Sequence, residues 1–293
     1  MFSNQLKTIV LLGVLSSLLI GLGGLIGGST LHVMLVIAVL MNLGAWFFSD
    51  RLVLMTSGAK EVSREEAPEL HRIVEDLTQR AGMPMPKVCI TPDSIPNAFA
   101  TGRDPSRGVV AVTAGLLQVL DRRELRGVIA HELAHIKNRD TLVASVAAAM
   151  SSAVSFVGQM ISFGALFGGG QQRDGESQGG GGSLLAAFVA PIAATLVQLG
   201  ISRSREYLAD ETAARITGDP EALALALMKL QRSGEVVVSR TEAEPRPALA
   251  ALSIVNPFAG GSRVLSWFST HPPVEARIER LLALAGRMQP RAA

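Results

Sequence analysis

Three stretches of the chain contain no Asp, Glu, Lys or Arg and are predominantly apolar: residues 8–49, 142–167 and 184–201. A helix needs about 20 apolar residues to cross the roughly 30 Å hydrocarbon core of a bilayer. The first stretch is about twice that length, and a Gly-Gly-Ser-Thr turn signal at residues 27–30 divides it. The pattern therefore predicts four transmembrane helices, at about 8–27, 31–49, 142–167 and 184–201.

Two of these spans have an alternative interpretation. The first, which follows Lys7, has the basic flank of a cleaved signal peptide, but a second span follows directly and no small-residue cleavage site precedes a polar region. The fourth is short, rich in alanine and interrupted by Pro191, which is also compatible with a partly inserted or interfacial helix. Residues 168–182 between the last two spans are rich in Gly and Gln, which predicts a flexible, exposed loop.

The distribution of basic residues predicts the orientation of the spans. Four crossings place the N-terminus and both polar segments, 50–141 and 202–293, on the same side. The loops on the other side contain a single basic residue, Arg173, whereas residues 50–141 contain many, including Arg51 and Lys60. Because basic loops stay in the cytoplasm, both polar segments are expected to be cytoplasmic.

The polar segments alternate between helix and strand patterns. A Ser63-x-x-Glu66 capping box followed by apolar residues at helical spacing predicts a helix over 63–81, which Gly82 ends. Short β-prone pieces separated by turn residues predict a small sheet from residues 87–91, 97–100 and 108–112.

Further helices are expected in the second half of each polar segment. One begins near residue 114, and another begins at Asp121 and continues into the third span without a breaker. Asp219-Pro220-Glu221 opens a helix that ends near Gly234, residues 235–262 resemble an irregular loop, and Pro272-Pro273 opens a last helix that ends near Gly286.

Overall composition narrows the classes of partner. The chain has 27 Lys and Arg against 25 Asp and Glu, a net charge of +2, with no basic cluster or aromatic-interleaved basic stripe, so nucleic acid is a poor candidate. The single cysteine, Cys89, supports no internal disulfide, and its apolar strand indicates a buried structural thiol.

The sequence His131-Glu132-Leu133-Ala134-His135 matches the H-E-x-x-H metal motif. Because positions i and i+4 share one face of a helix, His131 and His135 can bind the same Zn²⁺. Glu132 between them can reach a water molecule on that metal. The motif lies inside the helix predicted from Asp121, so the spacing has the structural context it needs.

A catalytic zinc site normally has three protein ligands, so a third ligand is expected elsewhere in the chain. The preferred candidate is Glu206, because the predicted hairpin of spans three and four returns the chain to the membrane surface where the His135 helix ended. Asp210 follows four residues later on the same helical face, where it can accept the second ring N–H of a ligand histidine. His271 is the alternative ligand.

Several separated motifs carry a resemblance to a known family. The H-E-x-x-H string with a distant Glu206-x-x-x-Asp210 resembles the gluzincin metallopeptidases. Together with the string Asn97-Ala98-Phe99-Ala100-Thr101-Gly102, the two preceding spans and Thr270-His271-Pro272, it resembles the HtpX-type membrane heat-shock zinc proteases over nearly the whole chain. The CAAX prenyl endopeptidases are more distantly similar.

The resemblance implies a set of site residues. The chain would bind one Zn²⁺ through His131, His135 and Glu206. Glu132 would be the general base that activates the zinc-bound water and then the proton donor to the leaving amine. Substrate would add as a strand at an edge formed by Asn97, Ala98 and Phe99, with His271 donating to the oxyanion and Arg277 on the same side.

The resemblance also implies a fold, a location and a function. The expected fold is a mostly α membrane protein with four transmembrane helices and a cytoplasmic α+β zincin-like domain that carries a small sheet. Membrane hairpins 1–49 and 142–202 would alternate with the two halves of the catalytic domain, 50–141 and 203–293. The expected activity is zinc-dependent cleavage of membrane or misfolded polypeptides at the cytoplasmic face of a bacterial inner membrane, in quality control and stress response.

Two other functions stay open at this point. One is an enzyme of the same chemistry that is specific for CAAX-type prenylated peptides. That family has more than four transmembrane spans, which enclose a chamber, so the four predicted spans favour the first function, the cleavage of membrane or misfolded polypeptides. The other is a non-catalytic membrane scaffold, which would be expected to lose Glu132, and Glu132 is present.

Overall fold

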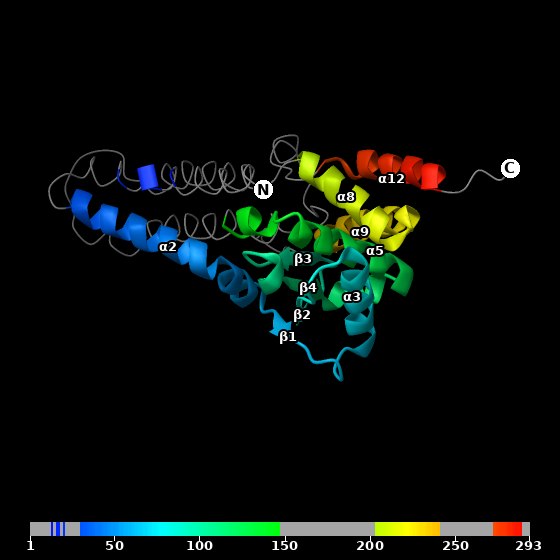
Figure 1. Cartoon of the computed structure of the whole chain (residues 1–293), viewed down its shortest axis with the longest axis horizontal. Helices are drawn as coiled ribbons and strands as arrows, with labels where there is room; N and C mark the ends of the chain where they lie inside the picture. Colours follow the sequence, from blue (N-terminus) through cyan, green and yellow to red (C-terminus); the bar gives the residue numbers. More distant parts are fainter. Residues whose placement is uncertain are drawn as a thin grey trace.

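A computed structural model describes residues 13, 16, 17, 20, 30–146, 203–240 and 272–288 (Figure 1). Outside these residues lie the predicted span at 184–201, all but four residues of the span at 8–27, nearly all of 142–167, the loop 168–182 and His271. The predicted second span falls within α2 (Thr30–Ser57). Within the described parts of the chain, no helix has the length and apolar character that a membrane crossing requires. The four transmembrane helices therefore stay a prediction.

The described chain is mostly helical and carries one small sheet. Its four strands are β1 (Lys60–Glu61), β2 (Lys87–Thr91), β3 (Ala98–Thr101) and β4 (Val109–Thr113). The order is β1-β2-β4-β3, with β2 and β4 parallel and the two outer pairs antiparallel. The three strands predicted from sequence are confirmed to within one residue, and β3 has no partner on its other side among the described strands.

Two apolar cores cover the two faces of this sheet. On one face, side chains of β2, β3 and β4 join those of α3 (Pro68–Ala81), α4 (Ala114–Val119) and α5 (Arg122–Lys137) in the main core. On the other face, Val53 and Leu54 from the end of α2 pack against Phe99 and the buried Cys89. Because β4 is covered on both faces, its sequence is a continuous apolar run rather than an alternating one.

The first predicted helix begins later than expected. The Ser63 and Glu66 hydrogen bonds of the capping box are present, at 2.7 and 3.3 Å, but they close a turn ahead of α3. The helix begins at Pro68, whose missing N–H and fixed φ suit the first turn of a helix. Gly82 ends it in the left-handed conformation with φ of 63°, as the sequence predicts.

The helix α5 begins as predicted but ends earlier. Asp121 and Glu124 form a reciprocal capping box at its start. The expected continuation into the third span is wrong, because α5 ends at Lys137 and Arg139 adopts a φ of 58°. A new helical segment then begins at Thr141.

Three helices from the distant second polar segment complete the domain: α8 (Arg203–Thr217), α9 (Pro220–Arg240) and α12 (Val274–Met288). The helices α8 and α9 pack against α5, and α12 packs against α8 and α9, so segments far apart in sequence lie side by side (Figure 1). The helix α9 begins at Pro220 as predicted but continues past Gly234.

The close crossing of α5 and α9 depends on Gly127. A Cβ at this position would lie 2.8 Å from the backbone nitrogen of Leu223, which is backbone and cannot swing aside. We expect Gly127→Val to lower the free energy of unfolding by about 1–3 kcal/mol through overpacking. Denaturant unfolding followed by circular dichroism measures this. Gly286→Ala is the matched control, since its Cβ would have no neighbour within 4 Å among the described atoms. Equal stability of the two variants would contradict the prediction.

Candidate metal centre

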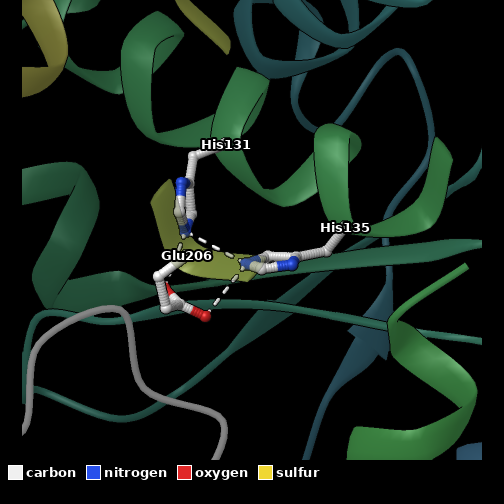
Figure 2. A group of neighbouring side chains, drawn as sticks. All are labelled: His131, His135 and Glu206. Atoms are coloured by element: carbon white, nitrogen blue, oxygen red, sulfur yellow. Dashed lines mark hydrogen bonds and ion pairs between the residues drawn. The ribbon is translucent and has the colours of Figure 1, made fainter. Parts of the chain in front are cut away.

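Two helices bring the candidate metal ligands together. His131 and His135 lie one turn apart on α5, and Glu206 projects toward them from α8 (Figure 2). The two Nε2 atoms are 3.1 Å apart, and each lies 3.5 Å from one carboxylate oxygen of Glu206. One ligand atom from each residue lies within 4.8 Å of the other two. The three side chains predicted as ligands therefore converge on one point.

The donor set fits a zinc ion. Two imidazole nitrogens and one carboxylate oxygen form a donor set typical of catalytic zinc sites, which leave a further position open. The rings of His131 and His135 are nearly perpendicular, at 89°, so their Nε2 atoms point at a common position rather than stacking. His131 and Glu206 are buried, whereas His135 is partly exposed.

A buried carboxylate–arginine pair lies behind His131. Asp210, one turn after Glu206 on α8, has an oxygen 2.9 Å from Nδ1 of His131, a distance at which the ring N–H donates to the carboxylate. Arg277 on α12 donates to both oxygens of Asp210, at 2.7 and 2.9 Å. The sequence placed Asp210 on this face of the helix, but it gave no indication of the pairing with Arg277.

The charges in this cluster shift two pKa values in opposite directions. Burial and the charge of Arg277 lower the pKa of His131, but hydrogen bonds to Asp210 and Glu206 outweigh them and raise it to about 9. Burial raises the pKa of Asp210, but the charge of Arg277 and the hydrogen bond from His131 outweigh it and lower the pKa to about 2. Both directions describe a buried imidazolium–carboxylate pair. A cation bound at Nε2 takes the place of one imidazolium proton.

Arg277 occupies a different position from the one expected for a substrate-binding residue. Its side chain is 0% exposed, and besides Asp210 it approaches Glu206 to within 3.7 Å. Arg277 is fully buried against Asp210, which in turn contacts the candidate ligand His131. This arrangement favours a role for Arg277 in positioning Asp210. His271, expected on the same side, lies outside the described residues, three positions before α12 begins.

The Asn97–Phe99 segment lies at the edge of the sheet. The backbone of Asn97 pairs with Thr113 of β4 through two hydrogen bonds of 2.9 Å. In an antiparallel ladder the next residue points its N–H and C=O the other way, so the main chain of Ala98 faces away from β4. The side chains of Ala98 and Phe99 are buried on opposite faces of the sheet. Of these two residues, only Ala98 therefore directs its main chain to the outer side of β3, because the main chain of Phe99 faces Ala111 of β4.

Glu132 lies beside His131 on α5 and is buried. Its position follows from the motif, since consecutive helical residues are rotated by about 100° and Glu132 cannot share the His131–His135 face. Glu132 does not belong to the converging group of candidate ligands, and its charge acts on Arg277.

One further polar residue near the site was missed by the sequence reasoning. Asp140 lies with an oxygen 3.4 Å from Nδ1 of His135, and Arg205 approaches its other oxygen to 3.9 Å. The sequence did not indicate a contact between Asp140 and His135, because the helix was expected to continue. Asp140 reaches His135 only because α5 ends at Lys137.

The helical domain, the small sheet and the convergent histidine–glutamate cluster define a zincin-type metalloprotease. The sequence profile of peptidase family M48 matches residues 64–285. The chain belongs to this family.

Two curated relatives that match over nearly their whole length agree with this assignment. The chain is 47% identical over 292 residues to a protease HtpX homolog of Sulfurihydrogenibium sp. (strain YO3AOP1), covering 98% of each chain. It is 52% identical to a protease HtpX homolog of Thermococcus kodakarensis, covering 97% of each. The crystal structure of S. mikatae Ste24p matches with a TM-score of 0.46 and 17% identity, covering 96% of this chain and 66% of that one. The resemblance to HtpX-type proteases is confirmed.

Proposed function

We propose that the chain is an integral-membrane zinc endopeptidase that cleaves membrane or misfolded polypeptides at the cytoplasmic face of the inner membrane, in membrane protein quality control. The observation that carries the zinc assignment is the convergence of His131, His135 and Glu206 within 4.8 Å. The charge-free stretches of the sequence support the membrane location. Catalytic segments 50–141 and 203–293 then alternate with membrane hairpins 1–49 and 142–202.

Three side chains hold the ion in this proposal: His131 and His135 through Nε2, and Glu206 through its carboxylate. When bound, zinc acts as a Lewis acid toward the scissile carbonyl and the attacking water. Asp210 holds the ring of His131 with Nε2 directed at the site, because it lies against Nδ1. Arg277 keeps Asp210 ionised and in place.

Glu132 performs the proton transfers. Its carboxylate takes a proton from the attacking water and later delivers it to the amine that leaves. His271 donates a hydrogen bond to the developing oxyanion. This role is supported by the resemblance of Thr270-His271-Pro272 to the family motif.

The substrate backbone adds to the outer edge of β3, which has no neighbouring strand among the described residues. The main chain of Ala98 faces this edge, and Asn97 lies at its start, where its side chain can hydrogen-bond the substrate. Because main-chain pairing does not read side chains, this mode suits a protease that acts on many unfolded sequences.

The zinc assignment is tested by metal content and ligand replacement. The purified chain is expected to contain one zinc ion and to cleave casein. A chelator should abolish cleavage, and added Zn²⁺ should restore it. Glu206→Gln should weaken zinc binding, because an amide oxygen is a poorer ligand than a carboxylate. A Glu206→Gln variant with wild-type zinc affinity would refute the third ligand.

A further inference from the structure

The end of α5 folds back on the second metal-binding histidine. The N–H of Arg139 bonds to the carbonyl of Ile136 at 3.1 Å, and the N–H of Asp140 bonds to the carbonyl of His135 at 2.9 Å. With Arg139 in the left-handed conformation, these are the two hydrogen bonds of a Schellman motif. The backbone of Asp140 is thereby anchored to the residue whose ring its side chain approaches.

The side chain of Asp140 also approaches His135. Nε2 of His135 faces His131 and Glu206, so Nδ1 is the nitrogen that remains for a supporting contact. An oxygen of Asp140 lies 3.4 Å from that Nδ1. Asp140 is only 5% exposed, so its carboxylate interacts with little competition from water.

Arg205 compensates the buried charge of Asp140. Its guanidinium lies 3.9 Å from the second oxygen of Asp140, and its side chain is largely buried. Arg205 directly precedes the ligand Glu206 on α8, so this pair connects the two helices that carry the metal site. The arrangement parallels the one behind His131, where Arg277 pairs with Asp210.

We propose that Asp140 is a positioning residue for His135, with Arg205 as its counter-charge. Asp140 keeps the proton of His135 on Nδ1 and the lone pair of Nε2 directed at the metal. Each histidine of the motif then has its own carboxylate–arginine support, one provided by α8 and α12 and the other by the end of α5 and α8. The inference rests on the proposed zinc site and adds to it.

Zinc affinity of the full chain, measured by chelator competition, tests this role apart from activity. Asp140→Ala is expected to bind Zn²⁺ about 10- to 100-fold more weakly, the usual cost of losing an outer partner of a ligand histidine. The absorption spectrum of the Co²⁺-substituted variant should also change, because the orientation of His135 changes. Asp140→Asn keeps the shape and loses the charge, and a smaller loss of affinity is expected for it.

Asp76→Asn is the matched control. Asp76 is an exposed carboxylate of α3 that pairs with Arg126 of α5, so its replacement removes a carboxylate that contacts α5 without touching the site. Its zinc affinity and Co²⁺ spectrum should equal those of the wild type. If Asp140→Ala does not fold, as judged by circular dichroism of the metal-free chain, Asp140→Asn supplies the answer.

The outcomes distinguish a failure of the proposed metal site from a failure of the proposed role of Asp140. A wild type that binds no zinc refutes the proposed metal site itself. A wild type that binds zinc, with both Asp140 variants at wild-type affinity and spectrum, refutes the role of Asp140 alone. Lower thermal stability with unchanged zinc affinity also overturns it, because a purely structural residue behaves in that way.

Discussion

Glu132→Gln is expected to retain zinc and to cleave casein about 100- to 10,000-fold more slowly than the wild type. Glutamine has nearly the same shape but cannot accept the proton of the attacking water. Glu132 is buried beside His131 and does not belong to the convergent cluster of ligand atoms, so its replacement leaves the three candidate ligands in place. Elemental analysis of the purified variant gives zinc content, and initial rates with labelled casein give activity.

Glu211→Gln provides the comparison for that variant. Glu211 is an exposed residue of α8 that forms an ion pair with Arg215. Full activity and full zinc content are expected. Unchanged activity in Glu132→Gln would eliminate Glu132 as the general base, whereas loss of zinc in that variant would make it a structural part of the site.

The two candidate histidine ligands could be predicted from sequence because their geometry is local, whereas Glu206 lies far away in sequence and was reached through the predicted membrane hairpin and the family resemblance. The i, i+4 spacing of His131 and His135 places both on one helical face wherever the helix lies. Asp210 follows Glu206 by the same rule. The strands were equally accessible, since short β-prone runs between turn residues leave few alternatives.

The supporting residues could not be predicted in this way, because their roles depend on tertiary contacts. Arg277 and Arg280 both lie on α12, yet Arg277 is fully buried against Asp210 whereas Arg280 lies over the ring of Tyr207 near the surface. The family resemblance singled out Arg277, but nothing in the helical pattern shows that Arg277 is the one that is buried. Asp140 is reached through Arg139 in a left-handed conformation, for which glycine is the usual sequence signal.

Arg277→Met is expected to lower the free energy of unfolding by about 3–5 kcal/mol, because the buried carboxylate of Asp210 loses the cation that donates to both of its oxygens and keeps only its contact with His131. Methionine keeps much of the length and apolar stem of arginine, so the lost charge rather than a cavity dominates the effect. Denaturant unfolding of the metal-free chain followed by circular dichroism measures it. Arg280→Met, an exposed change on the same helix, should cost about 1 kcal/mol or less.

A double variant tests whether α12 is held in place mainly by the Arg277–Asp210 ion pair or by apolar packing. Removing both partners in Arg277→Met/Asp210→Leu eliminates the unpaired charge, so much of the stability should return although His131 loses its support. Zinc affinity should remain low in that variant, because no carboxylate then faces Nδ1 of His131. If Arg277→Met were as stable as Arg280→Met, the apolar face of α12 with Leu281 and Ala285 would suffice to hold it. Recovered stability with weak zinc binding would instead show that Arg277 serves the site through Asp210.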